Sequence, residues 1–174
     1  MSDTRTKVLD AAIELFSETG YDKASIRALG ERLGVTSAAL YYHFRNKQEI
    51  LTALAERVCA DVEALADKAD AESDLETRRR LVLDGYLAIV SEHRRVMAVL
   101  EASIATLRTL DVGARSARAM DRLAAQLGAE HRVRAVAALG ILTTVPVQLP
   151  SALRAPGRAQ LLAAALGALE HPVP

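Results

Sequence analysis

The sequence predicts an all-α fold of about nine helices, and three features of the chain support this prediction. Alanine and leucine, which favour helices, are abundant throughout, the alternation typical of strands is scarce, and turn residues recur at intervals. A chain of 174 residues also buries roughly 70 per cent of the surface that its unfolded form exposes, so a sizeable core is available. We expect two domains: three amino-terminal helices over residues 1–46 and a helical carboxy-terminal domain over residues 47–174.

Residues 25–44 predict two short helices joined by a tight turn. In the first, Ile26, Leu29 and Leu33 recur at the three- and four-residue steps that build one apolar face. Gly34 follows where a helix ends in the left-handed conformation, and the hydroxyl of Thr36 is placed to cap the next helix. Helix, glycine turn and helix form the helix-turn-helix pattern, whose second helix enters the major groove of DNA.

The second of these helices has an inner and an outer face. Leu40 and Phe44, four residues apart, face inward. Small residues at the amino end allow close approach to base edges, and the donors that follow can reach phosphate oxygens. The outer face consists of Ser37, Ala38, Ala39, Tyr41, Tyr42 and His43. Tyr41 is equally well explained as a half-buried packing residue, and a histidine such as His43 is usually an ordinary surface residue.

Two basic residues complete the candidate DNA-binding surface. Arg27 has the side chain best suited to bidentate pairing with guanine, so we assign it to base reading. Asn46 and Glu49 form a capping-box-like start to another helix, and this places Lys47 beside the first amides of that helix, where we assign it to phosphate. Both side chains would ordinarily be solvated surface charges, and the helix-turn-helix outline also occurs in proteins that bind no DNA. The prediction of DNA binding therefore rests on the helix-turn-helix pattern together with these side chains.

The charge balance restricts where DNA can bind. Twenty-two basic and 22 acidic residues give zero net charge, which excludes a generally basic coat. Within residues 24–47, four basic residues against Glu31 give a local excess of plus three, and we expect Asp10, Glu14 and Glu18 of the preceding helix to point away from DNA. A lone cysteine, Cys59, excludes an internal disulfide and a cysteine cluster for zinc, so we expect no metal or cofactor. No apolar signal core or membrane span is found, and we expect a cytoplasmic protein.

Residues 1–51 resemble the DNA-binding domain of the tetracycline-repressor (TetR) family in the segments VLDAAIELFSETGYDKAS, IRALGERLGV and TSAALYYHFRNKQEIL. The resemblance implies that Ser25 contacts phosphate, that Arg27 contacts a base, and that Ser37 to Ala39 form the base-facing tip. It also implies backbone contacts from Tyr41 to His43 and Lys47. Gly30 stands where the family commonly has alanine, and at an exposed helix interior it would cost roughly 0.5–1 kcal/mol.

Further helices follow from the same period and from helix-start signals. Ser73 with Glu76 forms a capping box, His93 to Arg95 form a corner, and DVG at 111–113 is expected to end the sixth helix. A segment with Pro146, Pro150 and Pro156 is expected to separate the last two helices. The expected helices beyond the two described span about residues 4–19, 47–68, 76–92, 97–110, 120–128, 131–145 and 157–170.

The last two helices are candidates for a homodimer interface. Their broad apolar surfaces contain small residues that allow close helix approach. The alternative is that they only fill the core of one subunit. A two-fold dimer would present two recognition helices to half-sites about one DNA turn apart, and the resemblance implies the same arrangement with a four-helix bundle between protomers. The candidate interface residues are Val136, Leu139, Gly140, Thr143, Leu162, Ala165, Leu166 and Leu169.

The resemblance implies a pocket for a small effector among the fifth to seventh helices. Only Tyr86 of the six aromatic residues lies beyond Phe44, which excludes an aromatic cage for a cation and favours an apolar ligand. Glu101 is either a polar handle in this pocket or a solvated residue on its outer side. The candidate ligand-binding residues are Tyr86, Met97, Leu100, Glu101, Ile104, Met120 and Leu123.

These observations favour a ligand-responsive repressor that binds a palindromic operator as a homodimer. An enzyme is the first alternative, but the sequence lacks a G-x-S-x-G motif, a phosphate-cradling glycine loop and H-E-x-x-H. A helical dimer that acts through protein contacts, with a vestigial helix-turn-helix, is the second. The presence of Arg27, Tyr42, His43 and Lys47 argues against a vestigial motif.

Overall fold

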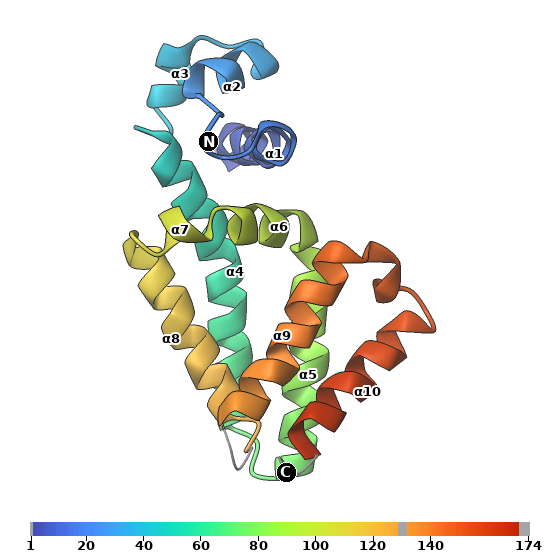
Figure 1. The fold of residues 1–174 in the computed structure, drawn as a ribbon. Helices are drawn as coiled ribbons and strands as arrows, with labels where there is room; N and C mark the ends of the chain where they lie inside the picture. Colours follow the sequence, from blue (N-terminus) through green and yellow to red (C-terminus); the bar gives the residue numbers. More distant parts are fainter. Residues whose placement is uncertain (1, 129–131, 171–174) are drawn as a thin grey trace. The chain divides into compact units, whose positions relative to one another are not determined.

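A computed structural model describes residues 2–128 and 132–170 and, within them, ten α-helices, one short 3-10 helix and no strand (Figure 1). The all-α prediction is confirmed, with ten helices where about nine were expected. The helices are α1 (Ser2–Thr19), α2 (Ile26–Leu33), α3 (Ser37–Tyr41), α4 (Lys47–Asp70), α5 (Leu75–Glu92), α6 (Arg94–Ala102), α7 (Ile104–Leu107), α8 (Asp111–Ala125), α9 (Arg132–Gln148), η1 (Pro150–Leu153) and α10 (Gly157–Glu170).

The chain divides into two compact units. One contains residues 1–57 and 95–114, and the other contains residues 58–94 and 115–174. These units differ from the predicted domains, 1–46 and 47–174, because α6 and α7 pack with the amino-terminal helices. The long helix α4 runs through both units.

The amino-terminal helices form a small core of their own. Val8, Ala12, Leu15 and Phe16 are buried, as the helical period predicted. Phe16 meets Tyr21 edge to face, with ring centroids 5.2 Å apart. α1 and α2 pack together, and α2 packs on α3.

The start of α5 differs by one residue from the expected capping box. Asp74, not Ser73, is the N-cap, and its carboxylate accepts a hydrogen bond from the Thr77 amide at 2.8 Å. A carboxylate also interacts favourably with the positive end of the helix, which a hydroxyl does not. This bond is the main reason why the pKa of Asp74 is lowered. Leu83, Tyr86, Leu87 and Val90 are buried as expected.

The prediction of one continuous helix over residues 97–110 is wrong, because the helix is interrupted at Ser103, between α6 and α7. The Ser103 backbone leaves the helical region at φ −107° and ψ 17°. Gly113 explains why DVG begins α8 instead of ending a helix. A Cβ at that position would lie 2.0 Å from the Leu107 carbonyl oxygen, so only glycine permits the close turn from α7 into α8.

The carboxy-terminal helices follow the prediction except at Pro146, which lies inside α9. Pro146 has no amide hydrogen to donate to the Leu142 carbonyl, and α9 ends two residues later, at Gln148. α9 packs against α10 and against α5, while η1 fills the connection between α9 and α10. The core between these helices includes Leu139, Leu142, Leu161 and Ala165.

Candidate DNA-binding site

The helix-turn-helix begins with a capped α2 and turns at Gly34. The Ser25 hydroxyl oxygen accepts a hydrogen bond from the Ala28 amide at 3.1 Å, so Ser25 is the N-cap of α2. Gly34 has φ 66°, the left-handed conformation expected at a helix end. The Val35 amide donates to the Gly30 carbonyl at 3.0 Å and closes the turn. The predicted position of the turn is confirmed.

Gly30 is buried, whereas the sequence analysis treated it as a glycine in an exposed helix interior. A Cβ at this position would lie 2.9 Å from the backbone oxygen of Val35 and 3.6 Å from the Leu40 side chain. Its absence of a side chain lets α2, the turn and α3 approach closely. Glycine is therefore required by packing at this position, and the expected loosening of α2 does not apply.

The structure predicts that Gly30→Ala destabilises the protein although alanine favours helices. The nearest atom is backbone, so the turn must shift, and we expect a loss of about 1–2 kcal/mol in the free energy of unfolding. Gly167→Ala in α10 is the matched control, because nothing lies within 4 Å of its added Cβ. The control gains about 0.5–1 kcal/mol from helix propensity. Chemical denaturation of both variants measures the difference, and equal stabilisation of the two would contradict this account.

α3 is held by two buried side chains and presents its other side to solvent. Leu40 and Phe44 are 2% and 1% exposed, whereas Tyr41 and Tyr42 are 53% and 77% exposed. These values exclude the half-buried packing role for Tyr41. α3 is shorter than expected, because the amides of His43 and Phe44 both bond to the Leu40 carbonyl and close the helix as a tight turn. Ala38 and Ala39 are exposed, and Ser37 and His43 are half-buried.

The amino end of α3 is capped as the sequence predicted. The Thr36 hydroxyl oxygen accepts from the Ala39 amide at 3.2 Å. A cap of this kind leaves the hydroxyl hydrogen of Thr36 available to a further acceptor. The cap thus satisfies one of the free amides in the first turn of α3.

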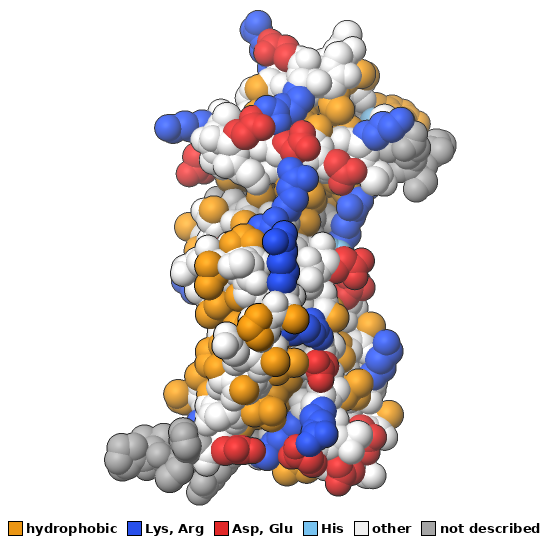
Figure 2. All heavy atoms as spheres, turned by 90° about the vertical axis from the view of Figure 1, so that its right-hand side faces the viewer, with side chains coloured by type: hydrophobic (Ala, Val, Ile, Leu, Met, Phe, Trp, Pro, Cys, Tyr) orange, Lys and Arg blue, Asp and Glu red, His pale blue; other side chains and the backbone are white. Residues whose placement is uncertain are grey.

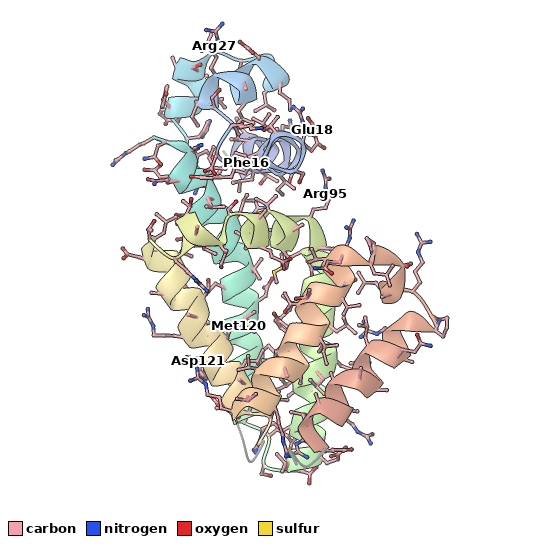
Figure 3. All side chains as sticks on the ribbon, in the orientation of Figure 1. Phe16, Glu18, Arg27, Arg95, Met120 and Asp121 are labelled. Atoms are coloured by element: carbon pink, nitrogen blue, oxygen red, sulfur yellow. The ribbon has the colours of Figure 1, made fainter. Side chains whose placement is uncertain are left out.

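Arg27 lies at the outer edge of α2 and extends into solvent (Figure 3). Its side chain is 84% exposed, and its Nε donates to Glu31 Oε1 at 2.9 Å one helical turn away. Exposed ion pairs of this type contribute little to stability, so the guanidinium can exchange this partner for another acceptor. Its assignment to a base stays a prediction.

Lys47 is engaged more fully than the sequence suggested. Its ammonium donates to the carbonyls of Tyr21, Asp22 and Ala24 at 2.8, 2.9 and 3.3 Å. It also lies 4.4 Å from the centre of the Tyr21 ring. An ammonium has three donor hydrogens, and here each has an acceptor within the protein. These contacts fasten the turn between α1 and α2 to the start of α4, and they favour a positioning role over the phosphate contact that we assigned from the sequence.

The helix-start signal that precedes Lys47 is confirmed. The Glu49 amide donates to Asn46 Oδ1 at 2.9 Å, and Glu49 Oε2 accepts from the Arg45 amide at 2.9 Å. The two side chains satisfy backbone amides reciprocally, as in a capping box. They fix the first turn of α4 next to the end of α3.

Arg5 is a candidate contact that the sequence analysis missed. Its guanidinium lies 4.4 Å from the centre of the Phe44 ring and donates to the His43 carbonyl at 3.3 Å. It thereby brings a positive charge from α1 to the end of the recognition segment. Thirty-eight residues separate Arg5 from His43, so no local spacing pattern indicates this contact.

The positive charge of the site is smaller than the residue count suggests. Arg32 donates to both carboxylate oxygens of Glu18, one of them at 3.0 Å, and lies 3.7 Å from Glu14. The hydrogen bond from Arg32 lowers the pKa of the Glu18 carboxyl. Arg95 of α6 also pairs with Glu14 at 3.5 Å. Thus the acidic side of α1 neutralises Arg32, whereas Arg5, Arg27 and Arg45 are exposed basic residues near α2 and α3.

The predicted effector residues lie in both units. Tyr86 and Leu123 are buried in the carboxy-terminal unit, where Met120 is half-buried. Met97 and Leu100 are half-buried and buried on α6, whereas Glu101 is exposed and Ile104 is 47% exposed. Glu101 therefore matches the solvated alternative better than the polar handle. The ligand-binding assignment as a whole stays a prediction.

Tyr86 is the most buried polar group among these residues. Its hydroxyl lies 2.7 Å from Thr143 Oγ1, and the Thr143 hydroxyl donates to the Leu139 carbonyl at 2.9 Å. The chain of bonds leaves the Tyr86 hydroxyl as donor to Thr143. Burial raises the pKa of the Tyr86 phenol, so it stays neutral. These bonds join α5 to α9 and place Thr143 toward the core.

The predicted interface residues separate into inner and outer sets. Leu139, Ala165 and Leu169 are 2%, 0% and 4% exposed within one subunit, so they fill its core, as the alternative interpretation proposed. Val136 is 50% exposed, and Gly140, Leu162 and Leu166 are half-buried. Val133, 77% exposed, extends the outer set by one helical turn. Figure 2 shows hydrophobic side chains over the carboxy-terminal helices, between separate basic side chains.

None of the helices in residues 2–128 and 132–170 is both long and apolar enough to cross a membrane. The same residues contain no group of three or more histidine, cysteine, aspartate or glutamate side chains arranged to hold a metal ion.

Comparison with known proteins identifies the amino-terminal helices. Residues 8–54, which include α2, α3 and the start of α4, match the model of "Bacterial regulatory proteins, tetR family". The chain is also 52% identical over 54 residues to the tetracycline repressor protein class A from transposon 1721 of Escherichia coli. Residues 8–54 therefore resemble the DNA-binding domain of the TetR family. The latter match covers 31% of this chain and 25% of that repressor, so the TetR assignment rests on the DNA-binding domain.

Solved structures extend the TetR likeness to the fold of the whole chain. AmtR of Mycobacterium smegmatis is 25% identical with a TM-score of 0.75, and the match covers 98% of this chain and 87% of that one. PfmR of Thermus thermophilus is 20% identical with a TM-score of 0.75, and the match covers 96% and 99% of the two chains. By sequence, the chain spans 25% to 35% of the length of the first four curated relatives that it matches. TetR-family proteins are DNA-binding transcriptional regulators and are generally not enzymes.

Proposed function

We propose that this chain is a ligand-responsive repressor that binds a palindromic operator as a homodimer. One observation carries the proposal: Leu40 of α3 and Phe44 just after it are buried, whereas Ala38, Ala39, Tyr41 and Tyr42 are exposed, and this segment lies in the matched TetR region. A helix that is packed on one side and solvent-exposed on the other is suited to insertion into the major groove. Repression is the activity named for the curated relatives from Escherichia coli.

The proposed contacts divide into positioning and reading groups. Ser25, Tyr41, Tyr42 and His43 contact phosphates, together with Arg5, because each carries a donor on or near the exposed side of the motif. Thr36, Ser37, Ala38 and Ala39 form the tip that approaches base edges, where two alanines limit readout to apolar contact and DNA shape. Lys47 contributes to DNA binding by holding the turn between α1 and α2. Arg27 is the leading base reader.

The proposal predicts that Arg27→Ala relaxes the preference at one base position. A bidentate arginine pair with guanine contributes about 1–3 kcal/mol of discrimination, which the variant loses while its binding to random DNA changes little. Glu31→Ala is the control, because it removes the ion-pair partner at 2.9 Å and leaves the guanidinium in place. Selection from a randomised operator library measures the preference at each position. A uniform loss across all sequences would instead assign Arg27 to phosphate.

The proposed dimer uses the outer surfaces of α9 and α10. Val133, Val136 and Gly140 lie at three- and four-residue steps on α9, and Leu162 and Leu166 follow on α10. Exposed valine side chains beside small residues allow helices of a second copy to approach closely. A two-fold dimer places two recognition helices on one face, as a palindrome requires.

The dimer predicts a strong effect of Val136→Glu. A glutamate at the interface must be desolvated without a partner, so we expect a monomer at concentrations where the parent protein is a dimer. Operator affinity should then fall at least tenfold, because one recognition helix acts alone. Light scattering after size-exclusion chromatography measures the mass. The control Ala117→Glu places the same charge on the exposed side of α8 and should leave both properties unchanged, and a dimeric Val136→Glu would contradict the interface.

The effector is proposed to be neutral and mostly apolar, since Tyr86 is the only aromatic side chain beyond Phe44. The dimer would have one arrangement that fits the operator and another in which the recognition helices are too far apart to bind it. A ligand that binds the second arrangement more tightly lowers operator affinity, to the extent that its affinities for the two arrangements differ. The remaining alternative is a helical dimer that acts only through protein contacts.

Binding to DNA upstream of its own gene tests the proposed function. Electrophoretic shifts at low salt should give a complex that a footprint resolves into two half-sites. A protein that shifts none of this DNA would favour the protein-contact alternative.

A further inference from the structure

The corner between α5 and α6 carries two basic side chains that contact different helices. His93 is the C-cap of α5, and its Nε2 lies 2.6 Å from Asp61 Oδ2 on α4. Arg95, in the first turn of α6, extends toward α1, where its guanidinium lies 3.5 Å from Glu14 Oε1 (Figure 3). Residues 58–94 belong to one compact unit and residues 95–114 to the other, so each contact lies within a single unit.

Glu14 connects Arg95 to the DNA-binding motif. Its other carboxylate oxygen, Oε2, lies 3.7 Å from Arg32 Nη1 in the last turn of α2. Arg32 also donates to both carboxylate oxygens of Glu18, one helical turn from Glu14 on the same face of α1. α2 ends one residue after Arg32, and Gly34 then turns the chain into α3. A single carboxylate thus links the start of α6 to the end of α2.

The corner is short and is anchored on both sides. Only Arg94 separates His93 from Arg95, and two residues span at most about 7 Å of chain. Val90 of α5 is 0% exposed and Val96 of α6 is 6% exposed, so a buried side chain holds the helix on each side of the corner. A displacement of the end of α5 is therefore carried into the first turn of α6.

The exposure of the Arg95 pair favours a positioning role over a stabilising one. The side chains of Arg95 and Glu14 are 58% and 49% exposed, and exposed ion pairs contribute little to stability. Such a pair can still bias which arrangement of α1, α2 and α6 predominates, because a small difference in free energy changes two populations severalfold.

We propose that the corner over residues 93–95 is a positioning device for the DNA-binding motif. His93 fixes the corner to α4, and Arg95 joins it, through Glu14, to the end of α2. An effector that displaces the end of α5 moves Arg95, and Glu14 then passes this displacement to α2. The consequence for operator binding rests on the proposed function, whereas the link between Arg95 and α2 does not.

The first test follows the backbone amide signals of the isotope-labelled full chain by NMR, without DNA. Arg95→Ala should shift the signals of Arg32 and Gly34, although both are distant in sequence. His93→Ala should shift the same signals, because the corner is no longer held to α4. The control is Arg108→Ala, which removes an exposed arginine from the same unit, one that has no carboxylate partner among the described residues. Unchanged signals of Arg32 and Gly34 in either corner variant would overturn the proposal.

The second test is a double-mutant cycle on operator affinity. Arg95→Ala should weaken binding about two- to fivefold, the size of effect that an exposed ion pair gives, and should weaken it more than Arg108→Ala does. This effect should disappear in a Glu14→Gln background, where the contact is already lost. An equal loss in the presence and absence of Glu14 would overturn the proposal, as would a loss no larger than that of the control.

The two tests separate the device from the proposed function. The amide spectrum of each variant also shows whether it is folded. If the parent protein bound no operator, the proposed function would fail, and the NMR comparison of Arg95→Ala with Arg108→Ala would still decide whether Arg95 is linked to α2.

Discussion

Phe44→Ala is expected to lower the free energy of unfolding by about 3–5 kcal/mol and to abolish DNA binding. Phe44 is 1% exposed, so truncation leaves a cavity beneath the recognition segment. The ring also carries the Arg5 guanidinium at 4.4 Å, and its loss frees that side chain as well. Chemical denaturation followed by circular dichroism measures the stability, and fluorescence anisotropy with labelled operator measures the binding.

Tyr42→Ala is the control for Phe44→Ala. Tyr42 is 77% exposed, so its truncation should change stability by less than about 0.5 kcal/mol while weakening DNA binding. Phe44→Ala tests whether the buried ring stabilises the motif, whereas Tyr42→Ala tests whether the exposed ring contacts DNA. If both variants were equally stable, Phe44 would not anchor the recognition segment as the structure indicates.

Lys47→Ala is expected to have the second large effect. It distinguishes a positioning role for Lys47, which holds the turn between α1 and α2, from a phosphate contact. The variant loses hydrogen bonds from an ammonium to three carbonyls, and we expect a loss of about 2–4 kcal/mol in the free energy of unfolding. Operator affinity should fall because the α1 to α2 turn loosens. The slope of log affinity against log salt should stay unchanged, since no phosphate contact is removed.

Lys23→Ala is the matched control for Lys47→Ala, since Lys23 is an exposed lysine on the same turn. It should leave stability unchanged. A Lys47→Ala protein of normal stability whose salt slope is flatter by about one would contradict the positioning role and restore the phosphate contact.

Local signals in the sequence predicted the DNA-binding motif well. Ser25, Gly34 and Thr36 act within three residues of their own positions, as caps and a turn. Leu40 and Phe44 follow from the helical period alone. Such features depend on neighbouring backbone, so a single sequence contains them.

Features that depend on distant parts of the chain could not be predicted in this way. Gly30 is interpreted correctly only when the Val35 oxygen is known to lie against it, and Gly113 only when the Leu107 oxygen does. Lys47 reaches carbonyls 23 to 26 residues away, a separation that no spacing rule covers. The apolar period of α9 and α10 likewise could not tell the buried Leu139 from the exposed Val136, because both helices are apolar on most sides.

The central claim is that two recognition helices of a dimer read one palindromic operator. The most direct measurement is the binding stoichiometry and affinity on a full palindrome and on a duplex with one half-site destroyed, over a range of salt concentrations. We predict two chains per palindrome, at least tenfold weaker binding to the single half-site, and a salt slope that is about half as steep there. One chain per duplex, with equal affinity and equal slope on both duplexes, would contradict the claim.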